Sequence, residues 1–152
     1  MGKRNRGFEP LRAQHDNDEL ILPRRMTSGS AAYDLFSLED VVIRPGQKHA
    51  FRLGIKAYMQ DDEALFIITR SGNGAKRRIT LANNVGCIDS DYYDNPDNEG
   101  EIIVMLVNDG TEDFKVRKGD SIAQAFFQKI LLVDDDFPLD KNREGGFGST
   151  TT

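Results

Sequence analysis

Short apolar runs, each closed by residues that favour turns, recur along most of this chain of 152 residues. The run from Val41 to Ile43 ends at Pro45-Gly46, and the run at 101–107 stops at Asn108-Asp109-Gly110. Runs this short, rich in β-branched and aromatic residues and bounded by Gly, Pro, Asn or Asp, are typical of a sandwich or barrel. We therefore expect an all-β fold with strands in the runs at 19–22, 41–43, 51–59, 64–69, 79–85 and 101–107.

Two segments allow a second interpretation. Residues 121–132 place Ile122, Ala125 and Phe126 at helical spacing, but their aromatic and β-branched content favours a strand. Residues 71–78 can form one or two helical turns, because Ser71 is a suitable N-cap.

The last residues of the chain, 140–152, are rich in Gly, Ser and Thr and cannot build a core. We expect a β-rich domain over residues 1–139 and a flexible C-terminal arm over 140–152. A single aromatic residue, Phe147, stands among the glycines of this arm, which indicates that its ring docks on something.

Composition excludes several classes of protein. The chain has 20 Lys and Arg against 25 Asp and Glu, a net charge of -5, which is unusual for a nucleic-acid-binding protein. No apolar run approaches the length of a membrane span, and no apolar stretch follows the basic N-terminus as in a secretory signal. The only cysteine, Cys87, cannot form an internal disulfide. We expect a cytoplasmic protein that binds neither nucleic acid nor membranes.

The densest acidic cluster lies between Asp89 and Glu101. A calcium loop of the EF-hand type is excluded, because Tyr93 and Asp94 occupy positions that need a ligand and a glycine. We expect residues 97–101 to form a solvated acidic loop. Asp89 follows an apolar run, so we expect a partly buried carboxylate with a functional reason for its burial.

Other candidate sites are weaker. The stretch Gly72–Lys76 lacks the spacing of a P-loop, although Arg70 and Ser71 beside it can offer donors to an anion. Cys87 has no histidine in a recognisable catalytic pattern, so we expect a small buried thiol. His49 is expected to be a solvated strand residue, and no Cys/His cluster suits zinc.

Five short motifs in a fixed order resemble those of the trimeric dUTP diphosphatase (dUTPase) family. Together they span residues 31–150, and their order is more specific than any one of them. The motifs are Ala31-Ala32-Tyr33-Asp34-Leu35, Arg70-Ser71-Gly72, the stretch 83–92 (NNVGCIDSDY), the stretch 118–124 (KGDSIAQ) and the stretch 145–150 (GGFGST).

The resemblance implies a distorted jelly-roll of the β-clip type that forms a homotrimer, with active sites shared between subunits and closed by the C-terminal arm. The implied reaction is the Mg²⁺-assisted hydrolysis of dUTP to dUMP and pyrophosphate. This reaction keeps uracil out of DNA and supplies dUMP for dTMP synthesis. The implied partners are dUTP and further copies of the chain, and Mg²⁺ is held through the substrate phosphates rather than directly by the protein.

The resemblance also implies residue roles. Asp89 is the base that activates the attacking water. Tyr92 lies against the deoxyribose and excludes a 2′-hydroxyl, Phe147 stacks on uracil, and Asp34 fixes a cation or a metal-bound water. The amide of Asn83 suits either pyrimidine, so backbone groups of the hairpin at 83–88 should select uracil. The implied substrate-binding set is Arg70, Ser71, Gly72, Asn83, Gly86, Ile88, Tyr92, Gln124, Arg143, Phe147, Gly148 and Ser149.

The chain departs from the family pattern at several positions. Ala32 and Arg78 stand where glycine is usual, Thr151 replaces a usual glycine, and Arg143 lies one residue closer to its glycines than is common. Residues 94–100 (DNPDNEG) lengthen the turn after the third motif. Two alternatives remain open at this point: a dCTP deaminase of the same fold, and a non-catalytic relative that only binds partners.

Overall fold

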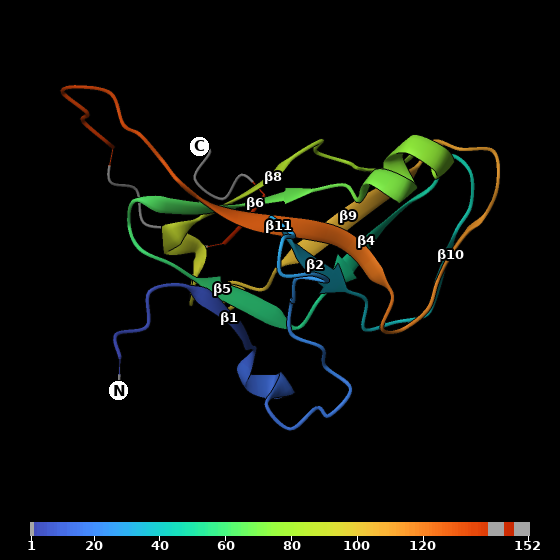
Figure 1. Ribbon diagram of the computed structural model, residues 1–152, viewed down its shortest axis with the longest axis horizontal. Coiled ribbons are helices and arrows are strands. Elements are labelled where there is room, and N and C mark those ends of the chain that lie inside the picture. Colours follow the sequence, from blue (N-terminus) through green and yellow to red (C-terminus); the bar gives the residue numbers. More distant parts are fainter. Residues whose placement is uncertain (1, 140–144, 148–152) are drawn as a thin grey trace.

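The computed structural model describes residues 2–139 and 145–147, and it consists almost entirely of short antiparallel strands (Figure 1). The expected all-β class is confirmed. The strands are β1 Gly7–Pro10, β2 Tyr33–Phe36, β3 Val41–Ile43, β4 Lys48–Arg52, β5 Ile55–Tyr58, β6 Glu63–Ile68, β7 Ile79–Leu81, β8 Gly86–Asp89, β9 Ile103–Asn108, β10 Phe114–Val116 and β11 Ser121–Lys129. Three short helical segments accompany them: η1 Arg12–Gln14, η2 Asn73–Arg77 and η3 Ser90–Tyr92.

The strands form two larger sheets and two strand pairs. The first sheet has the order β2-β11-β6-β8 and the second the order β4-β9-β7, while β1 pairs with β5 and β10 with β3. One continuous core takes side chains from both larger sheets. Its fully buried members include Leu35, Phe51, Leu65, Leu106 and Ala123.

The ambiguous segment at 121–132 is a strand over residues 121–129, as its composition favoured. β11 pairs with β2 on one side and β6 on the other, so it lies at the centre of its sheet. Ala123 and Ala125 are fully buried there. A register shift between Ser121 and Ala123 marks a bulge at the start of the strand, beside the fourth motif.

Two expected strands differ from the structure. Residues 19–22 form no strand. The run at 51–59 is broken after Arg52, because Gly54 has a φ of 68°, in the left-handed region that favours glycine.

The expected hairpin at 83–88 is also wrong. β7 ends at Leu81 and pairs with β9, whereas β8 pairs with β6 in the other sheet. The turn between them contains Asn84 with a φ of 63°, and the N–H of Val85 donates to the carbonyl of Asn83 over 2.7 Å. Residues 83–85 therefore carry the chain from one sheet to the other.

The helical turn expected near Ser71 is present as η2, but Ser71 does not cap it. No side-chain cap bond is formed, and the carbonyl of Arg70 accepts from the N–H groups of Asn73 and Gly74. Arg78 follows the helix with a φ of 56°, which explains why glycine suits this position. No helix within residues 2–139 and 145–147 is long and apolar enough to cross a membrane.

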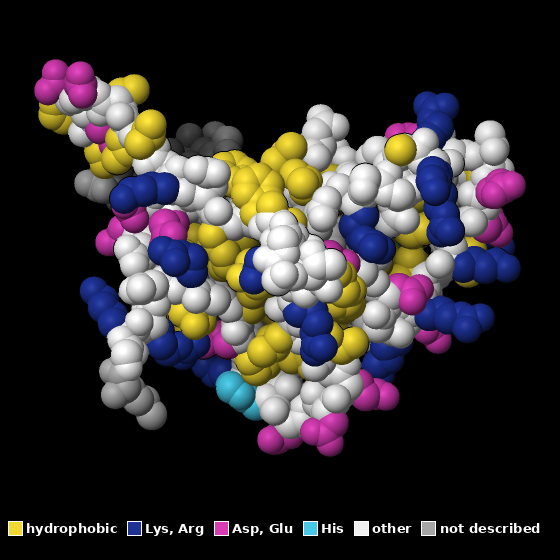
Figure 2. Space-filling view, in the orientation of Figure 1, with side chains coloured by type: hydrophobic (Ala, Val, Ile, Leu, Met, Phe, Trp, Pro, Cys, Tyr) yellow, Lys and Arg dark blue, Asp and Glu magenta, His cyan; other side chains and the backbone are white. Residues whose placement is uncertain are grey.

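The segment after β11 protrudes from the body of the molecule, where it is orange to red in Figure 1. Figure 2 shows apolar side chains gathered on this projection among acidic ones. Leu131, Val133, Phe137 and Leu139 are each more than two-thirds exposed, which is unusual for large apolar side chains. Within a single chain, this projection leaves a substantial apolar surface in water.

Candidate functional site

A hollow of about 240 Å³ lies beside β8, and most of the residues expected to bind a nucleoside line it. Phe147 of the C-terminal arm closes one side. The lining residues are Ile67, Asn83, Gly86, Cys87, Ile88, Asp89, Tyr92, Ile103, Gly146 and Phe147. Sequence reasoning missed the apolar contributions of Ile67 and Ile103, because they become visible only once the pairing of the strands is known.

The edge position of β8 suits this hollow for recognition through the backbone. β8 pairs with β6 and is the last strand of its sheet, so no further described strand covers its other edge. A Cβ added at Gly86 would lie 3.2 Å from the Cβ of Ile67, so glycine keeps this wall of the hollow open. Edge groups of this kind cannot exchange donor for acceptor, unlike the amide of Asn83.

Tyr92 forms a rigid wall of the hollow. It ends η3, and only 5% of the residue is exposed. Its hydroxyl donates to the carbonyl of Glu101 over 2.6 Å and accepts from the amide of Asn98 over 2.8 Å. The ring therefore faces the hollow with its distal end fixed.

Asp89 and Cys87 are both more exposed than expected. They alternate on the outward side of the edge strand, whereas the buried residue of β8 is Gly86. The expectations of a partly buried carboxylate and of a buried thiol are therefore wrong for the single chain. The Sγ of Cys87 lies 3.8 Å from Oδ1 of Asp89, within reach of a weak S–H···O contact.

The residues expected to bind phosphates form a second group, around the ends of β6 and β11. Asp34 is buried, and its Oδ2 accepts from the hydroxyl of Ser121 over 2.8 Å and lies 3.6 Å from Nε of Arg70. Nη1 of Arg70 also donates to the carbonyl of Ser121 over 3.2 Å. The buried carboxylate thus fixes the guanidinium, while Ser71 and Gly72 follow directly on the exposed surface.

Gln124 joins this second group from the centre of the sheet. Its amide donates to the carbonyl of Thr69 over 3.3 Å. It lines a hollow of about 400 Å³ together with Asp34 and Ala32. Arg70 and Gly72 line a separate hollow of about 360 Å³ with Lys76 and Arg77.

The two groups lie apart within one chain. In the register of β6, Asp89 is opposite Ala64, whereas Gln124 is opposite Ile68. Four residues along a strand correspond to about 13 Å, before the lateral distance between β8 and β11 is added. One phosphate group cannot contact both side chains of the same chain.

The 94–100 loop is tied to the body of the protein, so the expectation of a solvated acidic loop over residues 97–101 is wrong for Glu99 and Glu101. Lys56 of β5 is only 4% exposed, and its ammonium donates to Asp94 and, over 2.9 Å, to Glu99. Burial lowers the pKa of Lys56, but these hydrogen bonds outweigh it and raise the pKa. Burial likewise raises the pKa of Glu99, and the hydrogen bonds from Lys56 and the N–H of Arg12 reverse this and lower it.

Glu101, just after the loop, is also buried. Its carboxylate accepts from Nε of Arg52 over 2.8 Å and from the N–H of Gly54 over 3.0 Å. These partners come from the break between β4 and β5. The sequence did not indicate that Lys56 is buried in β5. The partner of Asp94 and Glu99 in the 94–100 loop could therefore not be predicted.

Tyr93, which lies beside Glu9, Lys56 and Asp94, predicts a loss of stability at alkaline pH. These four residues are called the Lys56 cluster below. Burial and a hydrogen bond to Glu9 raise the pKa of Tyr93 to about 12 from its ordinary value of 10.0. Between these values the unfolded chain releases the proton while the folded chain keeps it, so stability is lost as the pH rises through this window. We expect urea unfolding between pH 9 and pH 11 to show a smaller loss for Tyr93→Phe than for the unchanged protein. Tyr33→Phe, outside the Lys56 cluster, is the matched control, and equal losses in all three proteins would contradict the prediction.

The described residues contain no group of three His, Cys, Asp or Glu side chains that could hold a metal ion. Arg143, Gly148 and Ser149 lie outside the described residues, as does most of the expected arm at 140–152.

Known proteins give an independent comparison. The sequence profile of the dUTPase family matches residues 18–151. A deoxyuridine 5′-triphosphate nucleotidohydrolase from Lactococcus lactis subsp. lactis is 41% identical over 146 residues, which cover 95% of this chain and 97% of the relative. A similarly named protein from Haemophilus influenzae is 39% identical over 138 residues, 86% of this chain and 87% of the relative.

Solved structures agree with these matches. The crystal structure of dUTPase from Streptococcus mutans superimposes with a TM-score of 0.76 at 38% identity, covering 84% of this chain and 98% of that one. A dUTPase from phage phi11 of Staphylococcus aureus, described with a structural Mg(II) ion, has the same fold with a TM-score of 0.71 at 17% identity, over 90% of this chain and 98% of that one. The fold and the hollow thus belong to a nucleotide-hydrolysing class of β protein. The chain is a member of the dUTPase family.

Proposed function

We propose that this chain is a dUTP diphosphatase that hydrolyses dUTP to dUMP and pyrophosphate. The observation that carries the proposal is the hollow beside β8, in which Asn83, Asp89, Tyr92 and Phe147 face one another. Its small volume suits a base and a sugar, with the phosphates outside it. The names of the relatives support the same reaction.

Uracil would be read by the backbone edge of β8 and the amide of Asn83. Uracil presents an acceptor at O4 and a donor at N3, and cytosine reverses both, so fixed edge groups leave cytosine with unpaired polar atoms. A site of this kind can reject the wrong partner by about 10⁴–10⁵-fold. The ring of Tyr92 would leave no space for a 2′-hydroxyl, and Phe147 would cover the base.

Asp89 would act as the general base. Its carboxylate accepts a proton from water while the water oxygen forms a bond to the α-phosphorus and the bond from that phosphorus to the bridging oxygen breaks, releasing pyrophosphate. A base in this position contributes about 10²–10⁴-fold in rate. Its exposure on β8 leaves room for the water and the phosphate in front of it.

Arg70, Ser71 and Gln124, with Arg143 of the arm, would bind the phosphate chain. The guanidinium of Arg70 can neutralise charge that develops in the transition state. Asp34 would fix a cation in this group, as it already does for the guanidinium of Arg70. When bound through the triphosphate oxygens, Mg²⁺ would supply further neutralisation of the phosphate charge.

A homotrimer with shared sites is part of the proposal. The separation of Asp89 from Gln124 along β6 supports a complete site that takes the two groups from different copies of the chain. The apolar projection at residues 131–139 offers surface that a neighbouring copy would cover. Closed symmetric assembly is the usual arrangement of homo-oligomers.

The test is a panel of dUTP, dCTP, dTTP and UTP with Mg²⁺, with the products separated by chromatography. We expect conversion of dUTP alone, to dUMP and pyrophosphate. Deamination of dCTP would contradict the proposal in favour of a deaminase of the same fold. Turnover of none of the four would favour a non-catalytic relative.

A further inference from the structure

We propose that Asn98 is a positioning residue that fixes the ring of Tyr92 and thereby strengthens the discrimination between deoxyribose and ribose. Asn98 belongs to the 94–100 loop, which departs from the family pattern. The inference rests on the proposed function, because it assigns a role to residues beside the proposed sugar site.

The first step is the direct contact. The Nδ2 of Asn98 donates to the hydroxyl of Tyr92 over 2.8 Å, and that hydroxyl donates to the carbonyl of Glu101. The ring is thus held at its far end by one side chain and one backbone group. The ring of Tyr92 can exclude a 2′-hydroxyl only if the ring cannot move away by a fraction of an ångström. The hydrogen bonds to its hydroxyl supply that rigidity.

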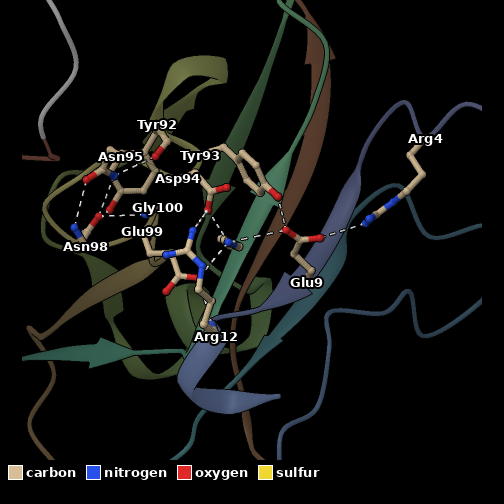
Figure 3. Close-up of polar contacts among 11 residues, drawn as sticks. Arg4, Glu9, Arg12, Tyr92, Tyr93, Asp94, Asn95, Asn98, Glu99 and Gly100 are labelled. Carbon is tan, nitrogen blue, oxygen red and sulfur yellow. Dashed lines mark hydrogen bonds and ion pairs between the residues drawn. The ribbon is translucent and has the colours of Figure 1, made fainter. Parts of the chain in front are cut away.

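The second step is that Asn98 itself is fixed (Figure 3). Its Oδ1 accepts from the amide of Asn95 over 2.7 Å and from the N–H of Gly100 over 3.1 Å. Asn95 is buried and donates through the same amide nitrogen to the carbonyl of Tyr92 over 2.8 Å. The loop therefore contacts Tyr92 at both its backbone and its hydroxyl.

Gly100 makes this close return possible. Its φ is 87°, and a Cβ there would lie 2.8 Å from the carbonyl oxygen of Tyr92. Any larger residue would push the end of the loop away from Tyr92 and displace the amide of Asn98. Glycine at this position is what lets the seven residues of the loop fold back on the end of η3.

The third step is the anchor to the body of the protein. The ammonium of Lys56 holds Asp94 and Glu99 at the two ends of the loop, and the guanidinium of Arg12 lies within 3.6 Å of Glu99. Because Lys56 is buried on β5, the loop takes its position from the strands rather than from solvent. The chain of contacts thus runs from β5 through the loop to the wall of the nucleoside hollow.

The loop also contacts the C-terminal arm. A Cβ at Gly145 would lie 2.8 Å from Oδ2 of Asp97, and a Cβ at Gly146 would lie 3.0 Å from Cε2 of Tyr92. The arm thus passes directly beside the tyrosine ring at Gly146, and beside the movable end of the Asp97 side chain at Gly145. A fixed ring therefore also defines the path by which Phe147 reaches the hollow.

The test is a double-mutant cycle on Tyr92→Phe and Asn98→Ala, read as the ratio of kcat/KM for dUTP to that for UTP. Tyr92→Phe keeps the ring and the hydrogen bonds within the loop but removes the hydroxyl. We expect each single change to lower the ratio by about five- to tenfold, the usual effect of one lost hydrogen bond. The double variant should lower it no further than Tyr92→Phe alone, because that change already removes the hydroxyl through which Asn98 acts, together with its bond to Glu101.

Pro96→Ala is the matched control, since Pro96 is an exposed residue of the same loop, and it should leave the ratio unchanged. Single effects that multiply in the double variant, or an unchanged ratio in Tyr92→Phe, would overturn the inference. Tyr92→Phe decides the matter even if Asn98→Ala fails to fold.

Binding of dUMP and UMP, measured by calorimetry, separates this inference from the proposed function. If the unchanged protein binds dUMP and rejects UMP but the variants reject UMP equally well, only the role of Asn98 is overturned. If the unchanged protein neither binds dUMP nor turns over dUTP, the proposed function fails and the inference fails with it.

Discussion

Asp89→Asn should reduce the turnover of dUTP by about 10²–10⁴-fold while leaving the binding of dUTP nearly intact. The amide has almost the same shape as the carboxylate but cannot accept the proton of the attacking water. The hollow beside β8 keeps its other walls, so the base and the sugar lose none of their contacts. Single-turnover kinetics and calorimetry with a non-hydrolysable dUTP analogue measure the two effects separately.

A matched control removes a carboxylate elsewhere on the surface. Asp61 is exposed in the turn before β6 and is not part of the hollow, so Asp61→Asn should behave like the unchanged protein. Turnover of Asp89→Asn within a few-fold of normal would exclude Asp89 as the base. A loss of binding equal to the loss of turnover would instead assign the carboxylate to substrate binding.

The strands could be predicted where the pattern is local. The run at 64–69 and the segment at 121–129 could be predicted as strands from their aromatic and β-branched residues, and both lie in the sheet β2-β11-β6-β8. The break at Gly54 and the sheet change at residues 83–85 could not be predicted, because they depend on which strands pair. A turn that joins two strands of one sheet and a turn that joins two sheets can have the same residues.

Burial was harder to predict than strand position. Asp89 and Cys87 follow apolar residues, yet both are exposed because β8 is an edge strand with one face toward the hollow. Conversely, Lys56 sits in an alternating run and is buried, since the acidic ends of the 94–100 loop compensate its charge. Both outcomes follow from contacts between distant segments, which an amino-acid pattern does not contain.

The candidate site itself was predictable as a set of residues but not as an arrangement. The motif positions Asn83, Asp89, Tyr92 and Phe147 do meet, whereas Arg70 and Gln124 lie at the other end of the same strands. The residues behind the site, such as Asn98, carry no motif of their own. Their contribution becomes visible only from the hydrogen bonds that they make.

Two inactive variants should restore activity to each other if the site is shared between subunits. Arg70→Ala removes a phosphate-binding guanidinium and Asp89→Asn removes the base, so each alone should lose at least about 10²-fold in turnover. When the two are unfolded, mixed in equal amounts and refolded together, subunits combine at random. About one quarter of the sites should then take an intact Asp89 from one chain and an intact Arg70 from another, as expected for a closed oligomer.

A site formed within one chain predicts a different activity for the mixture. If Asp89 and Arg70 served one site within the same chain, every site in the mixture would lack one of them, and activity would not exceed that of the two variants measured separately. Arg70→Ala also leaves the buried carboxylate of Asp34 without its guanidinium, so the thermal midpoint of each variant must be measured first. A lower stability of Arg70→Ala does not prevent the recovery of activity in the mixture. A destabilised subunit still contributes an intact Asp89 once it has assembled.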